Sequence, residues 1–232
     1  AHQQNIIPVV DAAIKKANIK KEDITAIAFT KGPGLLGSLL VGSSFAKSFA
    51  IGMNIPLITV NHMQGHILSH FIDEGKPMPK FPFLCLTVSG GHTQIVKVES
   101  PNRMEVIGTT IDDAAGEAFD KSAKLLGLSY PGGPLIDKYA KNGNPHAFEF
   151  GKPQVKELNF SFSGLKTSIM RLIQKGVVEN HNFIAENLED LCASIQHSII
   201  SILLKKLEKA IKQTGIEQLA IAGGVSANSY LR

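Results

Sequence analysis

Two histidines, His62 and His66, stand four positions apart just after a short apolar run, Pro56 to Val60. On a helix, residues four positions apart lie on the same face, one turn from each other. Two imidazoles placed in this way can ligate one transition metal ion together. The run before them is typical of a short buried strand. We therefore expect the pair where a strand ends and a helix begins, which is where ligand sites gather in α/β folds.

The residue between the two histidines argues against one use of such a pair. The spacing resembles the HExxH motif of zinc peptidases, in which the glutamate is the general base. Met63 occupies that position. Without a carboxylate there, water attacking a peptide bond lacks its proton acceptor. Taken alone, the pair leaves open both a metal site and two unrelated helix histidines.

Three glycine-containing loops follow apolar segments and could bind an anion. They begin at Lys31 (KGPGLLGS), at Ser89 (SGGHT) and at Ala222 (AGGVSAN). Free main-chain amides and the dipole of a following helix favour phosphate in such loops. A packing turn explains the first loop equally well. The alternatives are an ordinary hairpin turn for the second loop and a packing turn for the third. Together, the second and third loops would grip phosphates from two sides, as in a nucleotide cleft of the actin and sugar-kinase type.

Acidic residues follow the hairpins. Asp112 and Asp113 precede a helix and are interpreted as its caps. Asp120 lies inside that helix, and Asp137 lies one turn into the next one, after the rigid turn that contains Gly133. These last three residues could converge to bind a ribose.

Ser161 and Ser163 mark a hydroxyl-rich helix entry. We interpret them as capping residues, because no acid or histidine partner stands out in the sequence to activate a nucleophile.

The bulk properties bound the class of protein. The 232 residues are 44% hydrophobic, enough for one large domain or two small ones. A net charge of +4 permits an RNA or nucleotide partner without requiring one. Cys85 and Cys192 lie in apolar surroundings and are expected to be buried free thiols.

We find no signal peptide and no apolar run that reaches the length of a membrane span, so a cytoplasmic location is expected. The chain starts without Met inside a helical pattern and stops as another helix begins, so a fragment is expected.

Hydrophobic periodicity predicts a mixed α/β fold. A first unit should run helix, strand, helix, strand, helix around a parallel sheet, with residues 24–30 forming a strand buried on both faces. The Pro- and Gly-rich segment Gly75 to Pro82 should separate domains 1–78 and 79–232. The second domain should contain antiparallel strands at 83–88, 92–99 and 104–110, helices at 116–126, 134–141, 164–175 and 188–214, a final strand at 218–221 and the start of another helix.

The ordered motifs resemble one family. They are KGPGLLGS from Lys31, NHMQGH from Asn61, VSGGHTQ from Val88, DDAAGEAFDK from Asp112, YPGGP from Tyr130, FSFSGLK from Phe160 and GGVSAN from Gly223. The set is similar to the TsaD (YgjD) family of bacterial tRNA threonylcarbamoyladenosine transferases, formerly labelled O-sialoglycoprotein endopeptidases or glycoproteases. The resemblance implies an actin-like ATPase fold, two similar subdomains with a nucleotide cleft between them, here truncated at both termini.

The resemblance also implies an activity and its ligands. The family transfers the threonylcarbamoyl group from threonylcarbamoyl-adenylate to the adenosine beside the anticodon of tRNAs. One divalent metal ion, iron by preference or zinc, and ATP or the adenylate would be bound. Motif by motif, the metal ligands correspond to His62 and His66, the substrate loop to Thr87, Val88, Ser89, Gly90 and Gly91, and the nucleotide site to Asp120, Gly133, Asp137 and Asn228. No catalytic base is assigned.

The expected partners are tRNA, TsaB and TsaE, with TsaC supplying the adenylate, and no membrane. The third metal ligand of the family is an aspartate in a segment absent from this sequence, so the fragment alone is expected to be inactive. Two alternatives stay open, a metal-dependent glycoprotease and a non-catalytic nucleotide-binding scaffold.

Overall fold

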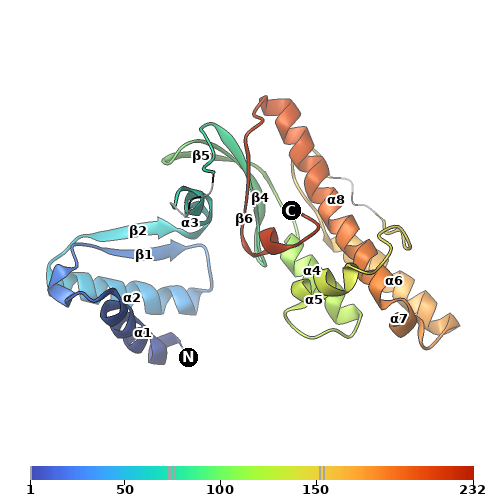
Figure 1. Ribbon diagram of the computed structural model, residues 1–232, viewed down its shortest axis with the longest axis horizontal. Helices are drawn as coiled ribbons and strands as arrows, with labels where there is room; N and C mark the ends of the chain where they lie inside the picture. The colour runs from blue at the N-terminus through green and yellow to red at the C-terminus, as the bar shows by residue number, and fades with distance from the viewer. Residues whose placement is uncertain (1, 73–74, 76, 152, 154) are drawn as a thin grey trace. The chain divides into compact units, whose positions relative to one another are not determined.

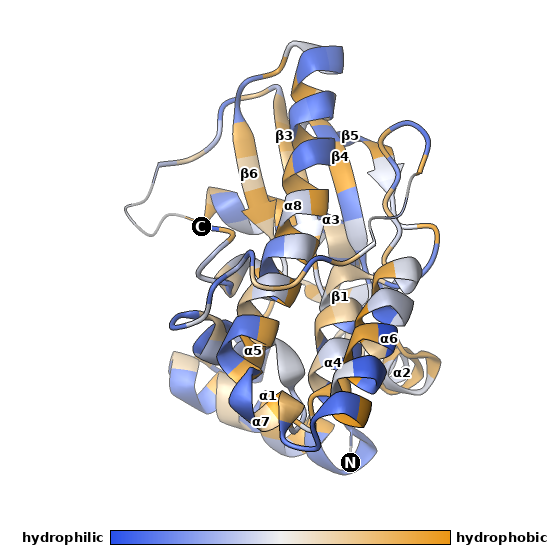
Figure 2. Ribbon diagram, turned by 90° about the vertical axis from the view of Figure 1, so that its right-hand side faces the viewer, coloured by the Kyte–Doolittle hydropathy of each residue, from blue (hydrophilic) through white to orange (hydrophobic). Residues whose placement is uncertain are grey.

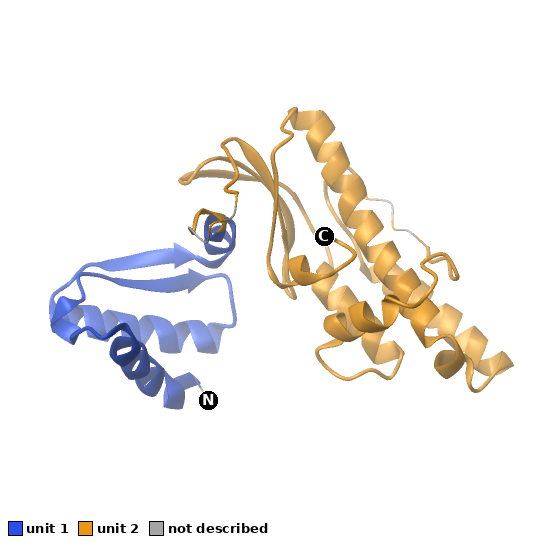
Figure 3. Ribbon diagram, in the orientation of Figure 1, with its two compact units in different colours: residues 1–69 blue, residues 70–232 orange. Residues whose placement is uncertain are grey.

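The computed structural model describes residues 2–72, 75, 77–151, 153 and 155–232. The chain forms two compact units, residues 1–69 and residues 70–232 (Figure 3). The boundary at residues 78 and 79, drawn from the Gly75 to Pro82 segment, stays a prediction. Residue 76 of that segment lies outside the described residues.

The first unit alternates helices with two parallel strands (Figure 1). Ile27 of one strand lies opposite Leu57 of the other. This arrangement confirms the predicted order of helix, strand, helix, strand, helix. The elements are α1 His2–Ala17, the 3₁₀ turn η1 Lys21–Asp23, β1 Ile27–Gly32, α2 Leu36–Met53, β2 Leu57–Asn61 and α3 His62–Leu68.

The strands of this unit are less buried than the sequence suggested. No residue of β1 or β2 is fully buried, and β1 begins at Ile27, three residues later than expected. The sheet has two strands, α2 packs against it, and α1 packs against α2 on the same side (Figure 1). Helix α3 also contacts both strands, yet Ile58 stays 50% exposed. The prediction of a strand buried on both faces was wrong.

Helix α2 is rich in apolar residues, which serines and Lys47 interrupt. Among the described residues, it alone is long and apolar enough to cross a membrane by length and composition. The prediction that no apolar run reaches the length of a membrane span was wrong for this helix. Its buried residues are Ala46 and Ala50. Core helices meet the same criterion, so the composition of α2 does not by itself indicate a membrane span.

The second unit is built on a mixed sheet of strand order β5-β4-β3-β6. β3 runs antiparallel to β4 and parallel to β6, and Cys85 lies opposite both Val96 and Ala220. The antiparallel β3-β4-β5 arrangement confirms the predicted hairpins. The strands are β3 Phe83–Val88, β4 Thr93–Ser100, β5 Arg103–Thr109 and β6 Leu219–Ala222.

Helices complete this unit and begin within a residue or two of their predicted starts. The short α7 was not predicted, and a 3₁₀ turn replaces the helix expected after β6. The helical elements are η2 Ser69–Phe71, which spans the unit boundary, α4 Ala115–Leu125, α5 Gly132–Ala140, α6 Ser163–Glu179, α7 Phe183–Glu186, α8 Leu188–Thr214 and η3 Gly224–Ala227.

Strand β3 is the centre of the core, since all six of its residues are buried. Leu84, Leu86 and Val88 point to one face, where they join the cluster formed with α4, α6 and α8. On the other face, Phe83 packs against Phe71 and Phe81, with ring centroids 6.1 and 5.6 Å away. Figure 2 shows that β3 and β6 are largely hydrophobic, whereas hydrophobic and hydrophilic residues alternate along α8. A strand buried on both faces needs this near-continuous apolar sequence.

Both cysteines are buried and free, as predicted. Burial raises the pKa of Cys85 and of Cys192 to about 12. The thiolate is therefore disfavoured at neutral pH, and neither thiol is suited to act as a nucleophile.

Asp112 is a structural anchor rather than a helix cap. Its carboxylate accepts hydrogen bonds from Ser161 Oγ, from the main-chain N–H of Phe162 and from Ser163 Oγ, at 2.5, 2.8 and 2.7 Å. It thereby fixes the start of α6 beside the end of β5. The N-cap of α4 is Ala114, with no side-chain hydrogen bond. The capping interpretation was wrong, because the true partners lie about fifty residues away in sequence.

The neighbouring Asp113 is also not a cap, since it forms an ion pair with Lys121 at 2.7 Å. Ser161 and Ser163 do have an acid partner, but Asp112 holds them in place and no histidine joins the group among the described residues. The group is therefore structural.

The Asp112 anchor should contribute to stability in a pH-dependent way. Burial alone would raise the pKa of Asp112, but the hydrogen bonds from residues 161–163 outweigh it and hold the pKa below its usual value. A lowered folded-state pKa stabilises the fold above the unfolded value of about 3.9, and this contribution disappears as the pH falls through the folded-state pKa. We expect Asp112→Ala to lower the free energy of unfolding by about 1–2 kcal/mol at pH 7, allowing for its exposure.

Urea titration of both proteins between pH 7 and pH 3 measures this. The difference in free energy of unfolding between wild type and Asp112→Ala should become smaller below about pH 4. Glu208→Ala, which removes an exposed carboxylate from α8, is the control and should change little. A gap that stays constant down to pH 3 would contradict the ionic role.

Gly116 permits a close approach between α4 and the turn after β3. Its N–H donates to the carbonyl of Ser89 at 3.2 Å, and a Cβ at position 116 would come within 2.6 Å of that carbonyl oxygen. We expect Gly116→Ala to destabilise the protein by about 1–3 kcal/mol through overpacking. Gly164→Ala is a matched helical control, because its Cβ would meet only Pro153 at an ordinary 3.8 Å. Thermal unfolding should therefore show a lower midpoint for the first variant only.

Candidate functional site

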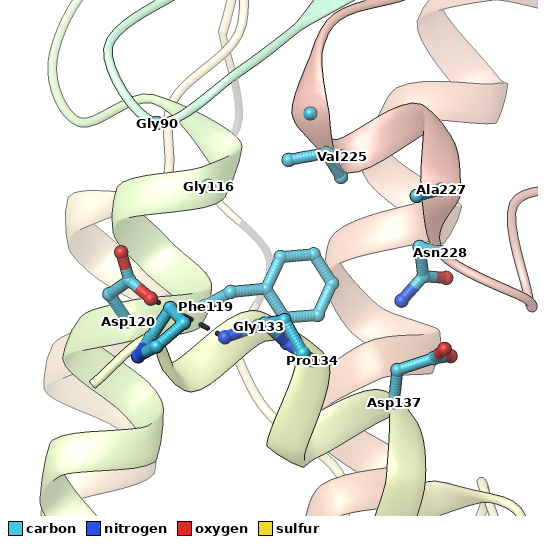
Figure 4. Close-up of a pocket in the computed structure, with 12 residues that line it drawn as sticks. Gly90, Gly116, Phe119, Asp120, Gly133, Pro134, Asp137, Val225, Ala227 and Asn228 are labelled. Carbon is cyan, nitrogen blue, oxygen red and sulfur yellow. Dashed lines mark hydrogen bonds between the residues drawn. The ribbon is translucent and has the colours of Figure 1, made fainter. Parts of the chain in front are cut away.

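A pocket of about 330 Å³ opens at the carboxyl ends of β3 and β6 (Figure 4). These two strands are parallel, so the loops that follow them leave the sheet at the same edge. The segment after β3 supplies Gly90, and the segment after β6 supplies Gly224 to Asn228. Helices α4 and α5 form the other walls. The lining residues are Gly90, Gly116, Phe119, Asp120, Pro131, Gly133, Pro134, Asp137, Gly224, Val225, Ala227 and Asn228.

Glycine brings main chain to the surface of this pocket. Gly90 and Gly224 have no side chain, so a ligand meets their backbone directly. Gly223 has a φ of +91°, and a Cβ there would collide with the carbonyl oxygen of Val88. The loop after β6 can therefore lie against the end of β3 only with glycine at this position.

Asp120 projects from α4 and is held by the start of α5. Its Oδ1 accepts hydrogen bonds from the main-chain N–H groups of Gly132 and Gly133, at 2.8 and 3.3 Å. Figure 4 shows the bond from Gly133. Two amide donors at a helix N-terminus make strong hydrogen bonds to a carboxylate oxygen. The side chain thus has a fixed orientation at the pocket wall.

Asp137 is held in a similar way from the opposite wall. Its Oδ1 accepts hydrogen bonds from Ser229 N–H and Ser229 Oγ, at 3.1 and 2.7 Å. Among the described residues, no hydrogen bond ends on Oδ2 of either Asp120 or Asp137. Each carboxylate therefore keeps one oxygen that can accept a hydroxyl donor, as a ribose would provide.

Asn228 is 9% exposed and closes the pocket beside Asp137. Its Nδ2 donates to Gln196 Oε1 of α8 at 2.7 Å. Its Oδ1 accepts from the main-chain N–H groups of Tyr230 and Leu231, at 3.1 and 3.2 Å. The amide plane is therefore fixed by partners on both of its ends.

The structure gathers some of the sequence-predicted residues and separates others. Gly90, Asp120, Gly133, Asp137 and Asn228 all line this one pocket, although they are spread over 139 sequence positions (228 − 90 + 1). The remaining members of the predicted substrate loop, Thr87, Val88, Ser89 and Gly91, are not among the lining residues.

Of these four residues, two lie in the buried strand β3 and one closes the turn that follows it. Thr87 and Val88 belong to β3 and are 0% exposed. Ser89 closes the turn, since its N–H donates to the carbonyl of His92 at 2.8 Å and its Oγ accepts from His92 N–H at 3.1 Å.

Several residues of the site were not singled out from the sequence. Phe119 and Pro134 form its apolar surface, and Gln196 and Ser229 hold Asn228 and Asp137. Ser229 adjoins a predicted residue and could have been suspected. Gln196 carried no signal, because its contact crosses 32 positions from the middle of a long helix.

The histidine pair lies in the first unit, on α3. Asn61 caps this helix, accepting hydrogen bonds at its Oδ1 from Met63 N–H and Gln64 N–H, at 2.9 and 3.2 Å. Met63 and Ile67 are buried, so His62 and His66 occupy the more exposed side. Their Nε2 atoms are 3.2 Å apart, and their rings meet edge to face with centroids 4.5 Å apart.

This separation fits two ligands of one metal ion. Nitrogens bound at about 2.0–2.1 Å at a tetrahedral angle lie roughly 3.3–3.4 Å apart. His62 and His66 thus have the chemistry and spacing for two positions of a coordination sphere. Across the described parts of the chain, no cluster of three or more His, Cys, Asp or Glu side chains is placed to hold a metal. A metal role for the pair therefore stays a prediction.

Comparison with known proteins identifies the family. The family model described as "TsaD: tRNA N6-adenosine threonylcarbamoyltransferase" matches residues 1–232. The chain is 65% identical to the tRNA N6-adenosine threonylcarbamoyltransferase of Christiangramia forsetii, over all of this chain and 68% of that protein. It is 62% identical to the enzyme of that name in Riemerella anatipestifer, and 58% to that of Porphyromonas gingivalis, covering 68% and 69% of their lengths.

Solved structures share the fold at low sequence identity. Full-length HypF, in a phosphate- and nucleotide-bound form, matches 97% of this chain and 43% of its own, with a TM-score of 0.63 and 15% identity. Component A of the (R)-2-hydroxyglutaryl-CoA dehydratase of Acidaminococcus fermentans matches 94% of this chain and 68% of its own, with a TM-score of 0.51 and 15% identity. These matches are consistent with the mixed α/β architecture. On the family match and the curated relatives, the chain belongs to the TsaD family of tRNA N6-adenosine threonylcarbamoyltransferases.

Proposed function

We propose that this protein transfers the threonylcarbamoyl group from threonylcarbamoyl-adenylate to the adenosine beside the anticodon of tRNA. The observation that carries the proposal is the pocket of the second unit. It joins two glycine loops to two carboxylates that each keep one oxygen open. That combination suits an adenylate, which has a phosphate and a ribose diol.

The groups of the pocket have distinct roles in this proposal. The main chain at Gly90 and Gly224 faces the phosphate, since amides in glycine loops bind anions. Asp120 and Asp137 accept hydrogen bonds from ribose hydroxyls. Phe119 and Pro134 provide the apolar surface for the base.

The transfer is a substitution at the carbamoyl carbonyl carbon. The N6 amine of the adenosine attacks that carbon, the bond from carbon to the phosphate oxygen breaks, and AMP leaves. The amine loses one proton, which passes to the departing phosphate oxygen or to water. No described side chain in the pocket needs to act as a nucleophile, so the contribution of the protein is positioning and stabilisation of charge.

His62 and His66 would hold the divalent ion in this proposal, iron by preference or zinc. Such an ion supplies Lewis-acid stabilisation of oxygen-centred negative charge when bound. The imidazoles need a fixed orientation to bind such an ion, and the Asn61 cap with the buried Met63 and Ile67 provides it by anchoring α3.

Peptide hydrolysis is not favoured by the same residues. Met63, at the position where a zinc peptidase has its general base, is 8% exposed and faces the core. A hydrophobic side chain there cannot accept a proton from water. The old glycoprotease label thus has no support from the geometry of α3.

The proposal extends to fold and partners. An actin-like ATPase fold with two similar subdomains agrees with the likeness to HypF and to the dehydratase component. The proposed macromolecular partners are tRNA, TsaB and TsaE, with TsaC supplying the adenylate. A cytoplasmic location follows from the tRNA substrate.

The direct test is threonylcarbamoyl transfer to tRNA by the natural protein with its partners, measured by nucleoside analysis. We expect His62→Ala to lower transfer at least tenfold and to reduce bound metal, because one of the two proposed histidine ligands in α3 is lost. His181→Ala removes an exposed histidine elsewhere and should leave both readings unchanged. Full transfer by His62→Ala would contradict the proposed metal role. The absence of transfer by the wild type would contradict the proposed function.

Asp120 can be tested separately. Asp120→Asn keeps an oxygen for the amides of Gly132 and Gly133 but replaces the second acceptor with a donor. We expect the KM for the adenylate to rise about tenfold with little change in kcat, since one charged hydrogen bond contributes roughly 1.5–3 kcal/mol. An unchanged KM would show that the carboxylate does not contact the substrate.

A further inference from the structure

Asn228 closes the proposed nucleotide pocket, and the identity of its two amide atoms follows from the groups around it. The main-chain N–H groups of Tyr230 and Leu231 point at one of them. A main-chain N–H can only donate, so that atom must be the oxygen. The assignment therefore does not depend on a choice between two similar orientations of the amide.

The amide nitrogen consequently faces α8 and the pocket. One of its two hydrogens is donated to Gln196 Oε1 at 2.7 Å. Figure 4 shows the nitrogen of Asn228 turned toward the pocket and the oxygen turned away from it. The second hydrogen is left for a group inside the pocket.

We infer that Gln196 is a positioning residue that orients Asn228 to present an N–H donor, so the ligand atom it meets is a hydrogen-bond acceptor. This inference rests on the proposed function, since it concerns the same pocket. Gln196 is 4% exposed and projects from the middle of α8. A buried amide oxygen costs free energy unless it accepts a hydrogen bond, and Asn228 Nδ2 is the donor here.

The turn that contains Asn228 is fixed to α8 at two neighbouring positions. Besides the contact from Gln196, His197 Nδ1 lies 3.0 Å from the hydroxyl of Tyr230. Between these two attachments, Ser229 holds Asp137. One short turn therefore sets the position of both polar side chains on this wall of the pocket.

The two side chains recognise opposite polarities. Asp137 offers an acceptor to the ligand, and Asn228 offers a donor. The matching ligand carries a hydroxyl donor close to a nitrogen or oxygen acceptor. A nucleoside has this pattern, with ribose hydroxyls beside the ring oxygen and the base nitrogens.

The test is calorimetric titration of the natural protein and its variants with ADP. Gln196→Met has a similar size but no acceptor, and we expect it to bind about tenfold more weakly. Gln196→Glu keeps an oxygen toward Asn228 and should bind within about threefold of wild type. Gln213→Met is the matched control, since it removes an exposed glutamine amide near the end of the same helix and should bind as wild type does.

Three results would overturn the inference. Gln196→Met could bind ADP as tightly as wild type, Gln196→Glu could lose as much affinity as Gln196→Met, or the wild type could bind no ADP. Thermal unfolding midpoints of the variants separate loss of orientation from loss of fold. The positioning role is supported if Gln196→Met loses affinity for ADP, Gln196→Glu keeps it, and the two variants unfold at the same temperature.

A second variant serves if Gln196→Met does not fold. Asn228→Asp keeps an oxygen for the two main-chain donors, and Gln196 can rotate its own amide to donate to the new carboxylate. The pocket then meets an acceptor in place of a donor, and we expect ADP binding to fall more than tenfold. Unchanged binding would overturn the inference.

Transfer assays on the same preparations separate this inference from the proposed function. Wild type that binds ADP with the expected variant pattern but transfers no threonylcarbamoyl group would contradict the function alone. Wild type that transfers the group, with Gln196→Met binding ADP normally, would contradict the inference alone.

Discussion

The complete burial of β3 is the constraint on which the second unit depends. A strand with no exposed residue must have partners at both edges and side chains packed on both faces. β4 and β6 fill the edges, one antiparallel and one parallel. The parallel neighbour matters most, because it brings a loop from the far end of the sequence to the place where β3 ends. The pocket exists at that edge for this reason.

The polar groups of the pocket are ordered before any ligand arrives. Asp120, Asp137 and Asn228 each make at least two hydrogen bonds within the protein. Ordering these side chains during folding means that binding does not have to restrict them again, which is an advantage when the task is positioning. The histidines of α3 are also ordered in advance, because an asparagine cap and two buried side chains fix the helix that carries them.

Much of this could be read from the sequence because the signals were local. Helical spacing placed His62 and His66 on one face, and glycine loops after apolar strands marked the pocket edge. What failed was non-local. Asp112 has the position of a cap but binds residues about fifty positions later, and the burial of β1 depended on neighbours that its own sequence does not specify. The side chains of Thr87 and Val88 are fully buried in β3, and their part in a substrate loop stays a prediction. Gln196 had no signature, because a glutamine in an amphipathic helix is ordinary until its partner is known.

Most of the donors that shape the pocket belong to the main chain. The N–H groups of Gly132, Gly133, Ser229, Tyr230 and Leu231 hold its three polar side chains. Exchange of the side chain at 230 or 231 leaves its amide in place, whereas one inserted or deleted residue moves every following amide by about 3.8 Å. Through evolution, then, these loops should drift in composition at such positions while keeping their lengths. In a family with such a pocket, we expect the lengths of these loops to be more conserved than their residue types.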